Sequence, residues 1–187
     1  GSEMCIRDRE YPDISMEIFQ GTYDDVVYWI KNGVVDVGFL SVSSAADIPI
    51  EPLYKDPLLC VVQKGHRTSK EPMSIEEMKN CQFVTQREST DADIQNFMKE
   101  NHLDVRSSYH VVDDLSTVVM VANGFGICLM PEMVMKDIPY EVDCFPVKPD
   151  ACRIIGIAAL NPDNMAPAVR TFYNRVLAMY QQEEYVK

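Results

Sequence analysis

Small polar side chains gather at three places in this sequence. Ser41, Ser43 and Ser44 come directly after the apolar string "VDVGFL". A second group follows the apolar string "QFV" and comprises Thr85, Gln86, Arg87, Ser89 and Thr90. Hydroxyls and amides donate and accept hydrogen bonds, and an arginine can hold a carboxylate through two parallel bonds. These residue types predict a site for a small polar ligand. An anion is favoured by Arg87 and by the N–H groups at the start of the helix that follows.

The third place is the turn "GFG", which consists of Gly124, Phe125 and Gly126 and lets the backbone approach a ligand closely. Each place also has a purely structural interpretation. Serines between a strand and a helix often form caps or turns, and Ser89 or Thr90 can cap the helix predicted at "DADIQNF". The glycine turn can simply end a helix, and Arg87 can be a solvated loop residue. The sequence alone leaves both interpretations open.

No pattern of catalytic residues is present. The sequence contains no G-x-S-x-G, no H-E-x-x-H and no phosphate-binding P-loop. The string "ANGFGICLM" lies between a predicted helix and a predicted strand, which is the reverse of the order in a dinucleotide-binding turn. Adjacent carboxylates occur at 24–25, 76–77 and 113–114, where predicted helix N-termini favour acidic residues. We therefore predict that the chain is not an enzyme and uses no metal or cofactor.

The cysteines and the net charge indicate the cellular compartment and limit the classes of partner that the chain can bind. The cysteines are Cys5, Cys60, Cys81, Cys128, Cys144 and Cys152. They form no C-x-x-C pair, and four lie in or beside apolar strings, where a free thiol packs as a small hydrophobe. A redox-sensing pair is the less favoured alternative. With no visible secretory signal and no apolar run of about 18 residues, we expect a cytoplasmic protein without membrane contact. The net charge of −12 disfavours nucleic-acid binding by this chain itself.

Strands and helices alternate along the chain. Ile14, Met16 and Ile18 alternate with polar residues, which predicts a half-buried strand. Thr22 and Asp25 form a capping box for a helix that ends at Gly33, and "VDVGFL" follows as a strand. Strand, helix and strand over so short a length predict a βαβ unit with parallel strands.

A second α/β unit follows, over residues 64–144. It comprises a capping box from Ser74 to Glu77, strands at "QFVT", "SSYHVV" and "GICLM", and helices at "TDADIQNFMKEN" and "DLSTVVMVANG". The chain then returns to strands at "CFPV" and "RIIGIAAL" and ends in a helix over about 167–182. Residues 1–10, "GSEMCIRDRE", show no period, and we expect them to be a tag or a non-native, disordered segment.

Several strings together resemble one family. "YPDISMEIFQG", a helix ending in "IKNGVVDVGF", "PLYKDPLLCVVQKGH" and "VVDDLSTVVMVANGFGICLMP" occur in the order and spacing of the effector-binding domain of LysR-type transcriptional regulators. The similarity extends from Tyr11 to about Tyr180. The resemblance implies an α/β, two-lobed fold like the type 2 periplasmic binding proteins, with Rossmann-like lobes joined by two crossover strands.

The resemblance also implies the division of the chain. Lobe I would hold residues 11–62 and 145–187, lobe II would hold 63–144, and the crossovers would lie near 60–63 and 144–148. The family's first strand and helix, and its winged helix-turn-helix, have no counterpart in this sequence. We therefore expect lobe I to be incomplete at its N-terminus, and DNA binding to need a segment that this chain lacks.

Function follows from this resemblance. In open α/β sheets, ligands lie beyond the carboxyl ends of the strands, so residues 41–44 and 85–90 would face each other across the interlobe cleft, with 124–126 on a third side. We predict a sensor of a small, anionic metabolite that forms a homodimer. The alternative is an extracytoplasmic solute-binding protein of the same fold for a small organic acid or amino acid. The cysteines and the string "GFGICLMP" favour the regulator.

Overall fold

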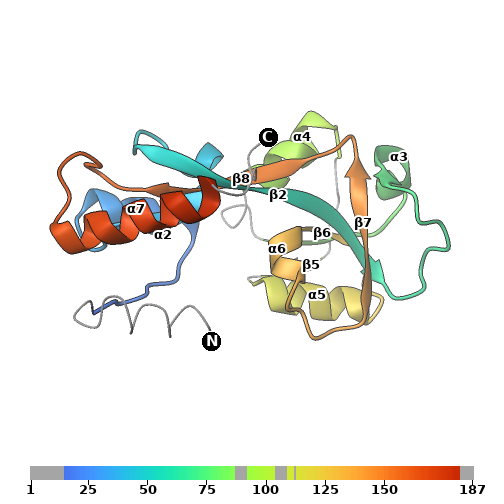
Figure 1. The fold of residues 1–187 in the computed structure, drawn as a ribbon. Helices are drawn as coiled ribbons and strands as arrows, with labels where there is room; N and C mark the ends of the chain where they lie inside the picture. Colours follow the sequence, from blue (N-terminus) through green and yellow to red (C-terminus); the bar gives the residue numbers. More distant parts are fainter. Residues whose placement is uncertain (1–14, 87–91, 104–108, 112, 182–187) are drawn as a thin grey trace.

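A computed structural model describes residues 15–86, 92–103, 109–111 and 113–181 of the chain. The fold consists of two lobes that share one long strand, β2 (Ile50–Gln63). Figure 1 shows β2 running from the lobe that carries α7 into the lobe that carries α3 to α6. The expected two-lobed α/β architecture is therefore what the structure shows.

Lobe I is a three-stranded antiparallel sheet between two helices. Its elements are α2 (Tyr23–Lys31), β1 (Gly38–Ser41), the 3-10 turn η1 (Val42–Ser44), β8 (Cys152–Ala158) and α7 (Pro167–Gln181). The sheet order is β1-β8-β2. Ala158 packs in a cluster with Ile30 of α2, whereas its neighbour Ile157 packs with Tyr173 of α7. Because adjacent strand residues point to opposite faces, the two helices cover opposite faces of the sheet.

Lobe II is built around the second half of β2. Its elements are β3 (Met73–Ser74), α3 (Ile75–Lys79), β4 (Val84–Gln86), α4 (Ala92–Glu100), β5 (Tyr109–Val111), α5 (Asp114–Ala122), β6 (Cys128–Pro131), α6 (Glu132–Met135) and β7 (Val142–Lys148). β2 pairs with β6 and β7 on either side, both antiparallel. β4 runs parallel to β5, and a parallel bridge from Phe83 to Ile127 places it beside β6. The Cys60 face of β2 packs against α3 and α4, and the Val61 face packs against α5.

The chain changes from one lobe to the other at two points. β2 pairs with β8 up to Pro57 and with β7 from Leu59 onward. The second crossing is the connection 149–151 between β7 and β8, where Leu58 N–H donates to the carbonyl of Ala151 at 2.9 Å. The predicted lobe boundaries, 62/63 and 144/145, fall within β2 and β7. We propose that the boundaries lie instead at 57/58 and at 149–151.

The predicted strand before α2 is wrong for the residues that the structure describes. Residues 15–20 have no regular structure and are exposed, and the side chain of Ile18 is 89% exposed. Among the described residues, β1 pairs only with β8, and the two run antiparallel, so the predicted parallel βαβ unit is not formed. An alternating pattern makes a strand only when a neighbouring edge satisfies its backbone groups. Ile14 lies outside the described residues.

The predicted helices are confirmed. Local sequence could predict them because hydrogen bonds within the first and last turns set where a helix begins and ends. In α2, Thr22 Oγ1 accepts from Asp25 N–H at 3.2 Å, and the Asp25 carboxylate accepts from Thr22 N–H at 2.9 Å. Gly33 then takes a φ of 66°, in the left-handed conformation that ends a helix. α3 begins with the same reciprocal box, between Ser74 and Glu77. The closing helix also forms, as α7.

Candidate functional site

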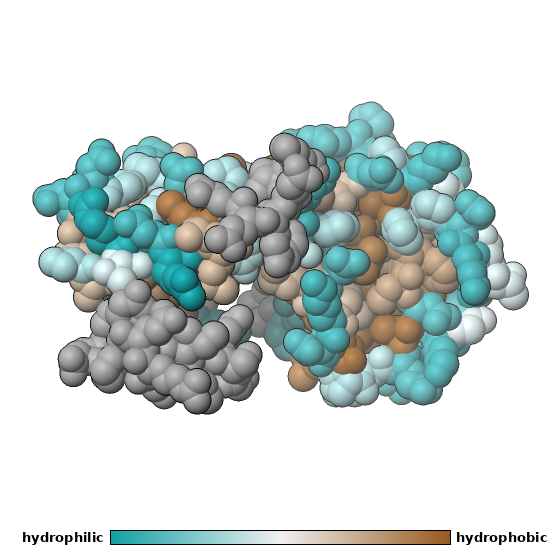
Figure 2. All heavy atoms as spheres, viewed as in Figure 1, coloured by the Kyte–Doolittle hydropathy of each residue, from teal (hydrophilic) through white to brown (hydrophobic). Residues whose placement is uncertain are grey.

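Polar side chains of both lobes meet where the chain crosses between them. We call this region the lobe junction and define it by η1 with Ser41 in lobe I, by the start of α4 in lobe II, and by Asp56 and Arg153 on the crossing strands. Figure 1 shows β2 and β8 running between the two lobes, and Figure 2 shows the described atoms of the lobes to the left and right in the same view. A change in the angle between the lobes would alter the contacts of the residues at the junction.

One hydrogen bond joins the two lobes directly at the junction. Ser43 Oγ donates to Asp93 Oδ1 at 2.6 Å, and the two residues are 50 positions apart in the chain. Ser41 Oγ lies 3.0 Å from Ser43 Oγ, which extends the contact into the buried end of β1. Asp93 lies in the first turn of α4, where the helix dipole favours a carboxylate. The sequence predicts both serines as site residues, but it predicts Asp93 only as part of a helix.

The third serine of the group is placed differently. Ser44 Oγ is buried and has no hydrogen-bond partner among the described residues. A buried hydroxyl without a partner costs free energy, about 1–3 kcal/mol for a neutral group. The structure brings all three predicted serines to the lobe junction.

The predicted lobe II residues are only partly described. Thr85 Oγ1 lies 3.3 Å from the carbonyl of Tyr109 and 3.1 Å from His110 Nδ1, so this hydroxyl is engaged with the neighbouring strand β5. Gln86 is the last residue of β4. The remaining predicted residues of this group, Arg87, Ser89 and Thr90, lie outside the described residues and stay predictions.

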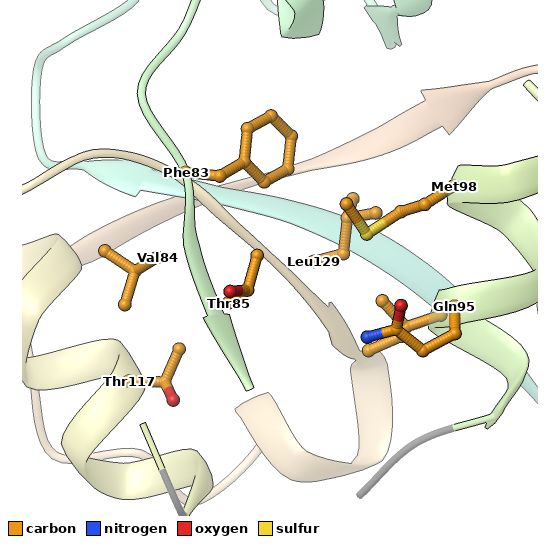
Figure 3. A pocket seen from close by; sticks show the side chains of 8 residues that line it. Phe83, Val84, Thr85, Gln95, Met98, Thr117 and Leu129 are labelled. Atoms are coloured by element: carbon orange, nitrogen blue, oxygen red, sulfur yellow. The ribbon is translucent and has the colours of Figure 1, made fainter. Parts of the chain in front are cut away.

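A small cavity lies beside Thr85, under α4. Its volume is about 20 Å³, and it is lined by Phe83, Val84, Thr85, Ile94, Gln95, Met98, Thr117 and Leu129. Figure 3 shows the labelled side chains coming from β4 and the residue before it, and from α4, α5 and β6. The space is about that of one water molecule, so it cannot hold a metabolite. This cavity is therefore not the predicted ligand site.

The structure does not bring the glycine turn to the lobe junction. Gly124 and Gly126 precede β6, and Ile127 N–H donates to the carbonyl of Gln82, ahead of β4, at 2.8 Å. Because β4 and β6 are parallel neighbours, this turn lies at their amino ends, whereas Gln86 lies at the carboxyl end. The turn therefore lies at the opposite edge of the sheet from Gln86, because a turn before a strand and a loop after its parallel neighbour lie at opposite edges. A role of the turn in ligand binding stays a prediction.

A buried ion pair lies on β2 and β8, the strands that lead across the lobe junction. Asp56 is fully buried, and its Oδ2 accepts from Arg153 Nε at 2.9 Å. Asp56 Oδ1 accepts from the backbone N–H of Met133 in α6 at 2.9 Å, and Arg153 Nη1 donates to the hydroxyl of Tyr23 in α2 at 3.1 Å. The network therefore joins the first turn of α2 in lobe I to the first turn of α6 in lobe II. Sequence reasoning missed it, although an acidic residue directly before the apolar run "PLLCVV" is a pattern that could have indicated a buried pair.

Two of the described cysteines, Cys60 and Cys128, are buried and poorly suited to redox chemistry. Burial raises the pKa of the Cys60 thiol to about 12, and burial also raises the pKa of Cys128 well above its usual value. A thiol that stays protonated at neutral pH is a weak nucleophile and a weak metal ligand. In the described part of the chain, no group of three or more His, Cys, Asp or Glu side chains is placed to hold a metal ion. The described helices also include none with the length and apolar character that crossing a bilayer requires.

Comparison with known proteins identifies the family. Residues 8–181 match the family model of the LysR substrate binding domain. The chain belongs to this family. Among curated relatives, it is 23% identical over 163 residues to the probable HTH-type transcriptional regulator LrrA of Synechococcus elongatus, covering 86% of this chain and 55% of LrrA. It is also 23% identical over 188 residues to the transcriptional dual regulator GltC of Bacillus subtilis, covering 94% of this chain and 61% of GltC. This LysR substrate-binding domain therefore spans little more than half the length of these relatives.

Solved structures of LysR domains share the fold. The regulatory domain of CcmR from Synechocystis, in complex with 2-PG, matches with a TM-score of 0.86 and 16% identity, over 96% of this chain and 90% of that one. The effector binding domain of QuiR, in complex with shikimate, matches with a TM-score of 0.82 and 22% identity, over 97% and 90%. The relatives are named as transcriptional regulators rather than enzymes. The family match supports the regulator over the solute-binding protein.

Proposed function

We propose that this LysR substrate-binding domain senses a small metabolite that binds at the lobe junction. The observation that carries the proposal is the hydrogen bond from Ser43 to Asp93, which links the lobes through two polar side chains that a ligand could engage in its place. The domains of CcmR and QuiR, which share the fold, were solved with small molecules. The proposal extends that behaviour to this chain.

The ligand class is a hydroxylated organic anion. Hydroxyls of Ser41, Ser43 and Ser44 can donate to a carboxylate or phosphate, and so can N–H groups at the start of α4. Asp93 is suited to accept a hydrogen bond from a ligand hydroxyl, because an ionised carboxylate only accepts. An anion without a hydroxyl would bring its negative charge near the carboxyl group of Asp93 without donating a hydrogen bond to it.

Binding would act by shifting the population of lobe arrangements. A ligand changes such an equilibrium only if it binds one arrangement better than the other. A ligand that holds η1 and α4 together in place of the Ser43–Asp93 bond has that property, because η1 and α4 belong to different lobes. The Asp56–Arg153 pair would serve as the pivot, since it lies where the strands cross.

The remaining parts of the proposal concern partners. We propose that the domain forms a homodimer, acts in the cytoplasm, and reaches DNA only through a winged helix-turn-helix of the whole regulator. We further propose that it has no enzymatic activity of its own. The family membership and the regulator names of the relatives support these points.

The test begins with native mass spectrometry of the purified domain, compared with its denatured mass. A dimer with an added mass that disappears on denaturation would deliver the effector. Calorimetric titration with that compound, and with its analogue lacking the hydroxyl, then tests whether the hydroxyl contributes to binding. Variants of the lobe junction locate the site. Ser44→Ala should weaken binding at least about ten-fold, since a hydrogen bond to a charged group contributes about 1.5–3 kcal/mol. Ser116→Ala, at an exposed position on α5, is the matched control.

The outcomes separate function from site. If Ser44→Ala and Asp93→Asn both bind the effector as tightly as the unchanged domain, the lobe junction is not the site. If no compound binds and the dimer carries no added mass, the sensor function of this domain is contradicted.

A further inference from the structure

A second pocket lies in lobe II, at the end away from the lobe junction. Its volume is about 470 Å³, within the range of about 300–1,000 Å³ that is usual for small-ligand sites. Gln63, the last residue of β2, lines it five positions beyond Leu58, so the pocket is about 16 Å along the strand from the crossing point. It is therefore separate from the proposed effector site.

The described lining of this pocket carries no permanently charged side chain. Among the described residues that line it, none is Asp, Glu, Lys or Arg. Charged neighbours in the sequence are paired elsewhere: Lys64 Nζ lies 2.8 Å from Glu141 Oε1, and Lys79 Nζ lies 3.2 Å from Glu76 Oε1. An ion entering the pocket would lose hydration without meeting an opposite charge, which costs free energy. The pocket therefore favours an uncharged ligand.

Two side-chain amides of the lining are tied to the main chain. Gln63 Nε2 donates to the carbonyl of Ala122 at 3.2 Å, and Asn80 Nδ2 donates to the carbonyl of Glu76 at 2.8 Å. Because an amide nitrogen carries two N–H groups, each side chain keeps one N–H and its own oxygen for another partner. A ligand therefore finds both a donor and an acceptor on each of these amides.

The other polar lining residues differ in what they offer. The backbone N–H of His66 donates to the carbonyl of Gln63 at 3.0 Å, which keeps this residue next to the first amide. A neutral imidazole has one donor and one acceptor, so His66 adds to the amides without changing their balance. Cys81 and Gln82 donate to main-chain carbonyls at 3.3 Å and 3.2 Å, and are therefore engaged within the protein.

Phe125 gives the pocket an apolar surface. Its ring meets that of Tyr109 edge to face, with centroids 5.6 Å apart and planes at 83°, so Tyr109 is engaged with it. Phe125 lines the pocket and remains 46% exposed. Gly126 has a φ of 143°, and a Cβ there would lie 2.3 Å from the carbonyl oxygen of Gln82, so the turn packs this closely only without a side chain. A flat, partly apolar ligand would bury part of Phe125 and gain free energy from it.

We propose that this pocket binds an uncharged, planar molecule that carries an N–H donor next to an acceptor, as a primary carboxamide or a nucleobase does. Asn and Gln amides recognise such an edge through two hydrogen bonds, one donated and one accepted. The net charge of −12 disfavours an anion, and no described carboxylate lines the pocket to hold a cation. The site does not depend on the function proposed for the lobe junction.

The test uses nicotinamide as the probe, with nicotinate and 3-acetylpyridine as its matched analogues. Nicotinate has nearly the same shape but is an anion, and 3-acetylpyridine keeps the carbonyl but lacks the N–H donors. Binding is followed by calorimetry and by NMR of the Asn and Gln side-chain amides, at about pH 8, where histidine is ordinarily neutral. We expect saturable binding of nicotinamide, about ten-fold weaker binding of nicotinate, and weaker binding of 3-acetylpyridine by about three-fold or more.

Two variants locate the site. Asn80→Ala removes one of the amides and Phe125→Ala removes the ring, and each should weaken nicotinamide binding about three-fold or more. Asn32→Ala is the matched control. Asn32 Nδ2 donates to the carbonyl of Tyr28 at 2.8 Å at the end of α2, the same bond that Asn80 makes at the end of α3, but in lobe I and outside the pocket. This variant should leave the dissociation constant unchanged.

Thermal unfolding confirms that each variant is folded, as expected because Asn80 and Phe125 are exposed. The proposal is overturned if nicotinamide shows no saturable binding. Nicotinate that binds as tightly as nicotinamide, and is equally weakened by Asn80→Ala, overturns the assignment of an uncharged ligand. Equal binding of 3-acetylpyridine overturns the role of the N–H donor. An unchanged dissociation constant in both Asn80→Ala and Phe125→Ala places any binding elsewhere and overturns the site.

Discussion

Replacing Asp56 by alanine is expected to destabilise this LysR substrate-binding domain more than the loss of any surface ion pair would. The carboxylate is fully buried and accepts hydrogen bonds from Arg153 Nε and from Met133 N–H. Its removal takes the Asp56 carboxylate away from the guanidinium of Arg153, whose side chain is only 12% exposed. It also leaves the N–H of Met133 without its acceptor.

The size of the effect follows from burial. Breaking a buried ion pair by removing one partner costs about 3–5 kcal/mol, because the remaining charge stays buried. For a chain of this size, each kcal/mol lowers the unfolding midpoint by about 2–4 °C. We therefore expect Asp56→Ala to lower the unfolding midpoint by about 6–20 °C. Asp56→Asn keeps the shape and an acceptor oxygen, so it should lose less.

Urea unfolding of three variants provides the assay. Asp56→Ala is compared with the double variant Asp56→Leu/Arg153→Met, which replaces the whole pair by apolar side chains. The double variant should recover most of the lost stability, because apolar replacement of a buried pair is often neutral or stabilising. Lys64→Ala is the control. It breaks the ion pair between Lys64 and Glu141, whose side chains are 59% and 80% exposed, and it should lower the free energy of unfolding by less than about 1 kcal/mol.

Two results would refute this reasoning. A cost for Asp56→Ala no larger than that of Lys64→Ala would mean that the pair is not buried in solution. A double variant as unstable as Asp56→Ala would mean that the charge left on Arg153 is not the cause of the loss.

Three further predictions concern charge, reactivity and packing. Hydrogen bonds from Ser74 and Arg67 lower the pKa of Glu77 from 4.5 to about 2, so its stabilisation is present above about pH 4.5 and lost as the pH falls toward 2. Acid unfolding of Glu77→Gln should therefore be less steep in that interval than that of the unchanged domain. Because burial raises the pKa of Cys60 to about 12, iodoacetamide should modify this thiol at neutral pH only in urea, as peptide mass mapping would report, and labelling of the folded domain would contradict its burial. Gly38→Ala should cost about 1–3 kcal/mol in urea unfolding, because its Cβ would lie 2.5 Å from Val26 Cγ1, and an unchanged midpoint would show that α2 can move away.

Features set by neighbouring residues could be predicted from the sequence, whereas features that depend on distant contacts could not. The capping boxes of Thr22 with Asp25 and of Ser74 with Glu77 span three residues each, and both predicted helix starts are confirmed. The family strings likewise predicted the two-lobed fold. The strand expected at residues 14–18 is wrong where it is described, because its alternation says nothing about whether a neighbouring edge is available.

For the site, the sequence by itself determined which small polar residues end a strand, and so it found Ser41, Ser43 and Ser44. Only the tertiary structure decided what they meet. Ser43 contacts Asp93, 50 positions away, and Arg153 contacts Asp56, 97 positions away. The tertiary structure likewise decided that the turn at 124–126 lies at the opposite edge of the sheet from Gln86. Helix caps are set by backbone geometry within one turn, whereas a contact between lobes depends on how the strands cross, and no short stretch of sequence carries that information.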